Sequence, residues 1–319
     1  MITPEAQIPA APKPKRMTLS AIKTGRLQKP TRIMIYSVDG CGKTTFASQA
    51  PKPIFLASED GTAQFDVARF PSVETWADML DGVQELTVGE HDYQTLVIDS
   101  LDWAEPLLWR SISDAAKVPT IEDVGGGFGK GYMAAMEGWR VLLAALERLQ
   151  RDRGMGLILI GHSLIKKFAN PEGDDYDRYS LKLNEKAAGL IREWVDAVLF
   201  ANFETFAVKD KAKRIRGVSS GSRIIYTQRT ASYDAKDRYG LPPQMPLSWA
   251  EFEKAKAAGQ PADPDALIAE ITRKAALLGG KDSTDTLAAV AKIGGDAIKL
   301  SQLNSWVNAK LNEVSTPTK

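Results

Sequence analysis

The sequence predicts an α/β protein with a mostly parallel central sheet flanked by helices, followed by a small helical module at the C-terminal end. Two observations predict this fold. Short apolar runs typical of buried strands recur along the chain, and helix-compatible segments separate them. Beyond residue 263 the sequence becomes Ala-rich, with apolar residues at helical spacing. A chain of 319 residues, 44% of them hydrophobic, can bury one large core plus a small appendage.

The strand-like runs are the first elements that support this fold. They occupy residues 33–36, 54–57, 96–98, 157–160 and 197–201. Between residues 203 and 230 the pattern changes to shorter β-like pieces. A turn at residues 219–221 followed by the apolar run 224–226 predicts a hairpin at the edge of the sheet.

The clearest helix precedes the fourth strand-like run. Its apolar residues recur at intervals of three and four, which gives the helix one apolar face, and Arg153-Gly154 ends it. This face consists of Trp139, Leu142, Leu143, Leu146 and Leu149. In the C-terminal module, the pairs Gly279-Gly280 and Gly294-Gly295 predict turns between helices.

These patterns divide the chain into four parts. Residues 1–29 mix proline with lysine and arginine and show no periodicity, which predicts a flexible basic segment. The α/β core is expected over residues 30–248, a linker over 249–262, and the helical module over 263–319.

Composition excludes several classes of protein. The net charge of +1 and the pI near 7.7 exclude a globally basic nucleic-acid binder, so any contact with DNA must come from local clusters. One cysteine and two histidines exclude a disulfide framework and a cysteine-based zinc site. Because no run approaches the length of a membrane span and the start lacks a signal-like apolar segment, we expect an intracellular protein with no membrane partner.

Residues 37–45 have the pattern of a phosphate-binding loop between a strand and a helix. The loop consists of Ser37, Val38, Asp39, Gly40, Cys41, Gly42, Lys43, Thr44 and Thr45. In such loops, glycines allow the backbone N–H groups to turn toward the phosphates, the lysine reaches the β- and γ-phosphate oxygens, and the threonine hydroxyl binds Mg²⁺. The sequence therefore predicts binding of a nucleoside triphosphate with Mg²⁺, and we expect ATP.

The first position of this loop departs from the usual pattern, because Ser37 stands where glycine is common. Serine can keep the turn if its φ is negative, whereas a positive φ would strain it. We therefore expect nucleotide binding, and slow turnover.

Three polar residues follow buried strand-like runs, where ligands of open α/β sheets bind. Asp99 is a candidate ligand of Mg²⁺ together with Thr44; the alternative is an aspartate that caps the next helix. Glu59 is a candidate base for the attacking water; the alternative is a solvated turn with Asp60. His162 is a candidate sensor of the γ-phosphate; the alternative is a histidine satisfied by neighbouring backbone.

Two segments combine cations and aromatic rings in a way that suits single-stranded DNA, with cations on phosphates and rings stacked on bases. One is a glycine-rich loop with Phe128, Lys130 and Tyr132. The other follows the fourth strand-like run and carries Lys166, Lys167, Phe168, Arg178 and Lys182. Nearby acids partly cancel the charge of the second segment, so a solvated loop remains the alternative.

Lys236 and Arg238 occupy alternate positions, which places them on one side of an extended segment. Such a pair can act in trans by reaching the γ-phosphate bound to a neighbouring subunit. A solvated charged turn is the alternative.

Taken together, these motifs resemble the RecA-like P-loop ATPases, and most closely the phage RecA-like single-strand annealing and recombination proteins of the AAA-type phage nucleotide-binding family. The resemblance covers residues 30–248. It implies that Glu59 in Ala57-Ser58-Glu59 activates water and that Asp99 before Ser100 serves the magnesium site. RecA itself usually has glutamine where this chain has His162. The segment 235–238 is similar to the Ala-Lys-x-Arg element of RecA-like hexameric helicases, whose basic residues complete a neighbour's ATP site.

This resemblance implies an ATP-dependent single-stranded DNA-binding protein for recombination or annealing, encoded by a phage or prophage and present in the cytoplasm of a bacterial host. It implies slow, DNA-linked ATP hydrolysis in a homo-oligomer, as a ring or a filament, with a single-strand-binding protein as a further candidate partner. Two rival hypotheses remain: a P-loop kinase or helicase-related motor, and a nucleotide-stabilised interaction module without catalysis.

Overall fold

The computed structural model describes residues 18–22, 24, 29–171, 173–209, 215–259, 264–296, 299–300, 303–304, 306–307 and 310. The strands are β1 (Arg32–Ser37), β2 (Pro53–Ala57), β3 (Ala68–Arg69), β4 (Thr95–Asp99), β5 (Gly156–Phe168), β6 (Tyr176–Leu181), β7 (Ala197–Lys209), β8 (Ile215–Tyr226) and β9 (Gln244–Pro246). The α-helices are α1 (Lys43–Ser48), α2 (Trp76–Val88), α3 (Leu101–Ala116), α4 (Lys130–Arg153), α5 (Glu185–Trp194), α6 (Trp249–Gly259), α7 (Pro264–Leu278) and α8 (Gly280–Ile293). Short 3₁₀ turns lie at Leu19–Ala21 and Ile121–Gly126.

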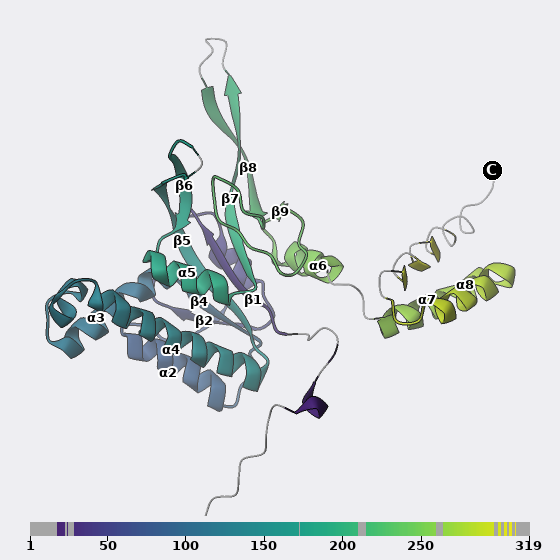
Figure 1. The fold of residues 1–319 in the computed structure, drawn as a ribbon, viewed down its shortest axis with the longest axis horizontal. Helices are drawn as coiled ribbons and strands as arrows, with labels where there is room; N and C mark the ends of the chain where they lie inside the picture. The colour runs from purple at the N-terminus through teal and green to yellow at the C-terminus, as the bar shows by residue number, and fades with distance from the viewer. Residues whose placement is uncertain are drawn as a thin grey trace, which may run out of the picture.

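The main sheet is mostly parallel, as the sequence predicts (Figure 1). Its strands follow the order β3-β2-β4-β5-β1-β7-β8-β9, and β3 through β7 in this order pair in parallel. The last two strands, β8 and β9, are antiparallel to their neighbours. The predicted α/β fold class is therefore confirmed. Because parallel strands end at the same edge, the carboxyl ends of β1, β2, β4 and β5 lie side by side.

Helices cover both faces of the sheet. Met34 and Tyr36 of β1 pack with α2, α3, α4 and α5 in one apolar cluster, whereas Ile33 and Ile35 pack with α1 and α6 in another. This division follows from strand geometry, since successive side chains point to opposite faces. On the first face, the apolar residues predicted for the helix before the fourth strand are buried in α4, with Trp139 fully buried, so that prediction is confirmed.

Strand β5 is longer than the predicted run 157–160. It continues to Phe168, because residues 163–168 pair with β6 in an antiparallel hairpin. The segment with Lys166 and Lys167, expected as a loop, is therefore strand whose backbone hydrogen bonds are satisfied by β6.

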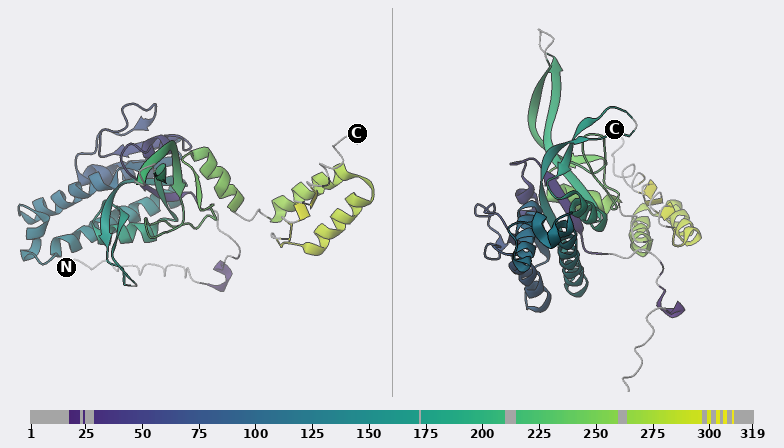
Figure 2. Two further views of the ribbon diagram at one scale, coloured as in Figure 1. Left: turned by 90° about the horizontal axis from the view of Figure 1, so that it is seen from above. Right: turned by 60° about the vertical axis from the view of Figure 1, so that its left-hand side comes forward.

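The predicted edge hairpin exists as β7 and β8, which project from the sheet (Figures 1 and 2). The turn expected at residues 219–221 is wrong, because these residues lie within β8. The strand register shifts between Phe203 and Thr205, and Gly221 has a φ of +79°. Gly221, predicted as a turn residue, therefore lies at the irregularity in the pairing of β7 with β8. The connection at 210–214 lies outside the described residues.

Residues 249–259, expected as the first part of a linker, form helix α6. Trp249 and Phe252 are buried, and their ring centroids lie 5.3 and 6.0 Å from that of Phe46 in α1. Two aromatic side chains in one helix thus bind it to the core, and burial of this area is strongly favourable. Residues 260–263 lie outside the described residues.

The C-terminal region contains α7 and α8, which pack together in a cluster of their own. The predicted turn between them occurs at Gly279 and Gly280, both with positive φ, and Gly294 follows the last residue of α8. Most of the basic segment 1–29 lies outside the described residues. Along the residues that the structure describes, no helix combines the length and apolar character needed to cross a bilayer.

We expect Phe252→Ala to lower the free energy of unfolding by about 3–5 kcal/mol, because it removes a fully buried ring from the interface of α6 with the core. Chemical denaturation measures this change. The control is Lys254→Ala on the same helix, whose side chain is 78% exposed. Equal stability of the two variants would show that α6 does not contribute to the core.

Candidate functional site

The phosphate-binding loop lies at the carboxyl edge of the sheet, between β1 and α1. Gly40 and Gly42 have φ of +69° and +104°, a region that residues with a side chain rarely adopt. Cys41 between them is fully buried in the cluster beneath the loop, which anchors the turn. The sequence needs glycine at these two positions because the loop reverses direction there.

Ser37, the unusual first residue of the loop, is compatible with this geometry. It is the last residue of β1, and its φ is not positive. Its hydroxyl donates to the carbonyl of Val38 at 2.7 Å and accepts from Nζ of Lys43 at 3.2 Å. The structure therefore meets the condition under which serine can keep the turn, namely a φ that is not positive.

The buried Lys43 and Asp99 form a polar group together with the half-buried Thr44. Nζ of Lys43 also lies 3.4 Å from the carbonyl of Val38, and the Thr44 hydroxyl donates to Oδ2 of Asp99 at 2.9 Å. Burial lowers the pKa of Lys43, and the negative charge of Asp99 opposes this. Burial raises the pKa of Asp99, while the bond from Thr44 and the charge of Lys43 oppose that change. Each charge thus helps the other to remain ionised.

These residues fit Mg²⁺ bound together with a nucleotide. Among the described residues, Oδ1 of Asp99 is buried with no hydrogen-bond partner, and it belongs to the carboxylate that contacts Thr44. Within the same residues, no cluster of three or more histidine, cysteine, aspartate or glutamate side chains could hold a metal alone. A site with one carboxylate, one hydroxyl, water and phosphate oxygens is typical of Mg²⁺.

His162 lies next to the loop, because β5 pairs with β1 so that His162 is opposite Ser37. Its Nδ1 lies 3.1 Å from both carboxylate oxygens of Asp102, and its backbone N–H donates to Oδ1 at 3.0 Å. The bond to Asp102 raises the pKa of His162, and burial opposes it. Nε2 lies 3.6 Å from Oδ1 of the exposed Asp39. The ring is thus held by a carboxylate and not by backbone.

Asp102 is a site residue that the sequence reasoning missed. It lies in the first turn of α3, three residues after Asp99, and its side chain is only 2% exposed. Burial opposes its ionisation, but hydrogen bonds from His162 hold its pKa below the usual value. Lys182 is also close, with Nζ 3.7 Å from Oδ2. The signal that could have found it is an acid one helical turn beyond the magnesium candidate.

Glu59 completes the cluster from the end of β2. Burial raises its pKa, and the negative charge of Asp99 raises it further. The ends of β2 and β4 are joined because Ser58 donates from its backbone N–H to the carbonyl of Asp99 and from its hydroxyl to that of Ser100, both at 2.9 Å. Glu59 therefore lies within electrostatic reach of the proposed magnesium ligand, as expected from the strand order.

The glycine-rich segment that the sequence predicts to bind DNA is not a loop throughout. Lys130 and Tyr132 lie in the first turn of α4, where Nζ of Lys130 donates to the carbonyl of Gly125 at 2.9 Å. The Tyr132 ring packs edge-on against Trp109, with centroids 5.5 Å apart. Phe128 is 99% exposed. Among the described residues, none of these three side chains makes a hydrogen bond, an ion pair or a ring contact with the phosphate-binding loop.

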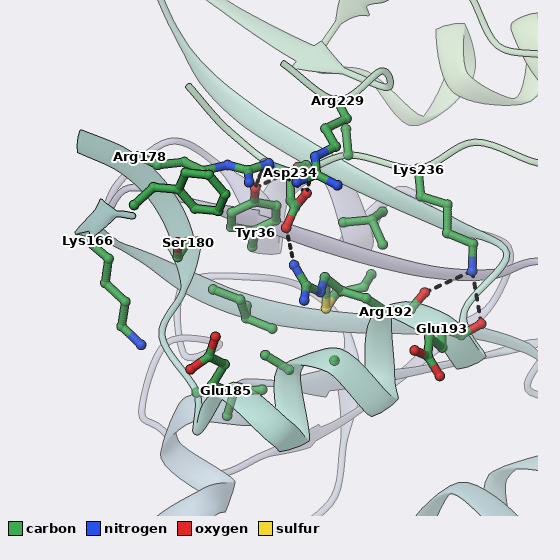
Figure 3. Close-up of a pocket in the computed structure, with 18 of the residues that line it drawn as sticks. Tyr36, Lys166, Arg178, Ser180, Glu185, Arg192, Glu193, Arg229, Asp234 and Lys236 are labelled. Atoms are coloured by element: carbon green, nitrogen blue, oxygen red, sulfur yellow. Dashed lines mark hydrogen bonds and ion pairs between the residues drawn. The ribbon is translucent and has the colours of Figure 1, made fainter. Parts of the chain in front are cut away.

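The second segment that the sequence predicts to bind DNA lines a cavity of about 650 Å³ between the β5–β6 hairpin, α5 and the segment 229–238 (Figure 3). Lys166, Lys167, Phe168 and Arg178 all line it, whereas Lys182 does not. Arg178 stacks on the ring of Phe168, with its guanidinium carbon 5.4 Å from the ring centroid. Seven cationic and three acidic side chains line this cavity, so its charge is predominantly positive.

Asp234 organises the cations of this cavity, and sequence reasoning missed it. Its carboxylate pairs with Arg178 at 2.7 Å, with Arg229 at 3.3 Å and with Arg192 (Figure 3). Its backbone N–H and carbonyl both bond to the hydroxyl of Tyr36, which fixes the segment to β1. Three guanidinium groups share one carboxylate, so positive charge remains for an anion.

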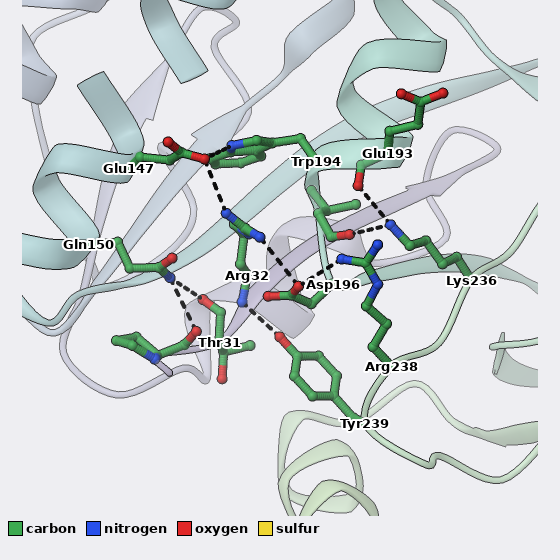
Figure 4. A network of polar contacts seen from close by, with 12 residues as sticks. Thr31, Arg32, Glu147, Gln150, Glu193, Trp194, Asp196, Lys236, Arg238 and Tyr239 are labelled. Carbon is green, nitrogen blue, oxygen red and sulfur yellow. Dashed lines mark hydrogen bonds and ion pairs between the residues drawn. The ribbon is translucent and has the colours of Figure 1, made fainter. Parts of the chain in front are cut away.

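Lys236 and Arg238 lie near the amino ends of β1 and β7 (Figure 4). The phosphate loop of the same chain follows the opposite, carboxyl end of β1. Nζ of Lys236 donates to three backbone carbonyls at the end of α5, at 2.6–2.9 Å. Arg238 pairs at 3.3 Å with Asp196, which also binds Arg32 at the start of β1. Within the chain, these two cations therefore stabilise the sheet edge.

A family model described as an AAA domain matches residues 29–239, from just before β1 to the residue after Arg238. The chain belongs to this AAA domain family. The match confirms the coarser prediction of a P-loop ATPase, a class that binds nucleotide, typically with Mg²⁺.

This AAA domain protein is also similar to individual proteins. Over 150 residues it is 27% identical to the SPbeta prophage-derived uncharacterized protein YorG of Bacillus subtilis (strain 168), with 44% of each chain covered. The chain thus spans less than half the length of this relative. Among solved structures it is similar to the RadB recombinase (13% identity, TM-score 0.37, covering 62% of this chain and 80% of that one). It is also similar to the flagellar accessory protein FlaH of Methanocaldococcus jannaschii (11% identity, TM-score 0.30, covering 65% and 87%).

A second buried carboxylate links α3 of this AAA domain protein to α5. Glu105 is 5% exposed, and its oxygens accept the backbone N–H of Asn184 at 2.9 and 3.2 Å. Burial raises the pKa of Glu105 to about 7, although the bond from Asn184 opposes this. The folded protein binds the proton of Glu105 more tightly than the unfolded chain does. Protonated Glu105 therefore contributes fully to the free energy of unfolding below the pKa that its carboxyl has in the unfolded chain. This contribution is lost as the pH rises through about 7, the pKa in the folded protein.

We therefore expect the free energy of unfolding of the wild type to fall by about 1–3 kcal/mol more than that of Glu105→Gln between about pH 5 and about pH 8. Urea denaturation across this range measures the difference. Glu137→Gln, at an exposed position of α4, is the control and should follow the wild type. Parallel pH profiles for wild type and Glu105→Gln would contradict the raised pKa.

Proposed function

We propose that this AAA domain protein is an ATP-dependent, single-stranded DNA-binding protein of recombination or annealing. The observation that carries the proposal is that one strand, β5, joins both sites. At the nucleotide edge it holds His162, and four to six residues further along it carries Lys166 and Phe168 of the cationic cavity. A change at the phosphates can therefore act on the cavity through continuous structure.

The nucleotide would bind to the loop between β1 and α1. Lys43 would contact the β- and γ-phosphate oxygens, and Thr44 and Asp99 would hold Mg²⁺. Bound Mg²⁺ supplies neutralisation of the charge that develops on these oxygens. Glu59 would orient the attacking water and accept its proton, a role that its raised pKa suits because the base is then matched more closely to neutral pH.

His162 and Asp102 would link the two sites. Asp102 lies on α3, which begins directly after Asp99 and Ser100, and it contacts both His162 and Lys182. A shift of His162 toward the γ-phosphate would alter this carboxylate contact. Since Lys182 follows β6 of the hairpin, the position of the hairpin would change with it.

The DNA would bind along the cationic cavity. Its lysines and arginines suit the phosphates of an unpaired strand, and the rings of Phe168 and Tyr176, 5.2 Å apart, suit stacking with bases. Asp234 partly neutralises the arginines, which favours moderate affinity and release. Lys236 and Arg238 would act in a homo-oligomer, ring or filament. Since they lie at the opposite sheet edge from their own loop, only a second copy can bring them to a γ-phosphate.

We expect Glu59→Gln to reduce the rate of ATP hydrolysis by about 100-fold or more while leaving ATP affinity nearly unchanged, because it removes the base but no phosphate contact. The wild-type rate should rise with pH through the raised pKa of Glu59, and this dependence should vanish in the variant. Steady-state turnover and equilibrium binding measure these effects. Asp60→Asn, on the adjacent exposed residue, is the control; near-zero turnover in the wild type as well would favour the non-catalytic module.

We expect the double variant Lys166→Ala/Lys167→Ala to bind single-stranded DNA more weakly, with a salt dependence lower by about 0.7 per lysine in log–log slope. Fluorescence anisotropy with an oligonucleotide, with and without a nonhydrolysable ATP analogue, measures this. Arg148→Ala/Arg151→Ala removes the same charge from the exposed side of α4 and is the control. Equal wild-type affinity with and without the analogue would reject the coupling, and no binding in either would reject the function.

A further inference from the structure

Arg223 brings a cation to the phosphate loop from the antiparallel side of the sheet. It lies in β8, opposite Phe203 of β7. Its carbonyl accepts the backbone N–H of Leu247 at 2.9 Å, just beyond β9. The backbone of Arg223 is thus held from both sides, by β7 and by the segment after β9, which sets the direction of the side chain.

The guanidinium group of Arg223 lies against the loop at Gly42. A Cβ atom placed on Gly42 would lie 2.9 Å from Nη1 and 3.7 Å from the guanidinium carbon of Arg223. Burial raises the pKa of Cys41, and the positive charge of Arg223 opposes this rise because it favours the thiolate. The same guanidinium carbon lies 5.8 Å from the ring centroid of Phe203, which supports it from the side.

Gly42 is the residue directly before Lys43, at the part of the loop whose N–H groups surround the phosphates. Glycine is needed here for two reasons, the φ of +104° and the close approach of Arg223. A guanidinium group is suited to this place because its planar fork can bind two phosphate oxygens at once, whereas an ammonium acts as a point charge.

We propose that Arg223 binds the phosphates of the nucleotide within its own chain, as a second cation beside Lys43. This inference rests on nucleotide binding by the AAA domain and is independent of the DNA part of the proposed function. Lys43 approaches the phosphates from the start of α1, and Arg223 approaches from β8. The nucleotide is therefore held between two elements from different parts of the sheet, and Arg223 is a binding residue of the site.

The test is the affinity of Arg223→Ala for ATP, ADP and adenosine, measured by isothermal titration calorimetry. We expect ATP and ADP to bind about tenfold more weakly or worse, and adenosine to bind as it does to the wild type, because only the phosphates lose a charge-assisted contact. Arg223→Lys should recover part of the lost affinity for ATP and ADP, because lysine keeps the positive charge. The affinity of this variant should still depend on salt. Arg140→Ala, an exposed arginine of α4, should bind all three ligands as the wild type does.

Unchanged ATP affinity in Arg223→Ala, within about twofold, would overturn the proposal. An equal loss for adenosine would also overturn it, since the arginine would then contact the base or the ribose. Thermal unfolding without nucleotide checks the fold of the variant. If Arg223→Ala unfolds, Arg223→Gln replaces it, with the same expected loss. If the wild type does not bind DNA, the assignment of Arg223 to the phosphates still stands. If the wild type does not bind ATP, both this assignment and the proposed function are overturned.

Discussion

The buried charges of Lys43 and Asp99 form the interaction on which the site depends. Each side chain alone would pay for burial by losing its charge, as the opposite shifts of their pKa values indicate. Together, each charge favours the ionised form of the other, and the hydroxyl of Thr44 bound to Asp99 favours the carboxylate further. The phosphate loop, the order of strands around β1 and the start of α3 all serve to hold these two groups in one place.

From Lys43 and Asp99, polar contacts extend through the first turn of α3 to β5. Asp99 ends β4, and the first turn of α3 immediately presents Asp102 to His162. His162 belongs to β5, whose far end forms the hairpin that lines the cationic cavity. One turn later, Glu105 binds the backbone at the start of α5, the helix on the other side of the same cavity. The beginning of α3 thus connects the nucleotide edge with the cavity through two buried carboxylates, Asp102 and Glu105.

Much of the site could be predicted from the sequence because it depends on local order. A strand, a glycine-rich turn and a helix must follow each other for a phosphate loop, and acids after buried strands must meet at one sheet edge. Asp234 and Arg223 could not be found this way, and for Asp102 local order marks only its place one helical turn after Asp99, not its partner. Their partners lie 56, 181 and 60 residues away in Arg178, Gly42 and His162, and no local pattern marks such pairs. The turn assigned to Gly221 was wrong for a related reason, since glycine serves a turn and a bulge equally well.

The sequence by itself determined the α/β class, the phosphate loop and the edge of the sheet where Lys43, Asp99, Glu59 and His162 meet. These features follow from hydrophobic periodicity and from the φ that only glycine adopts easily, and both act over a few residues. Only the tertiary structure decided that β5 continues into a hairpin, that α6 belongs to the core, and that arginines from three segments surround Asp234. Such features depend on which distant surfaces bury each other, and long-range packing and charge pairing leave no local signature in the chain.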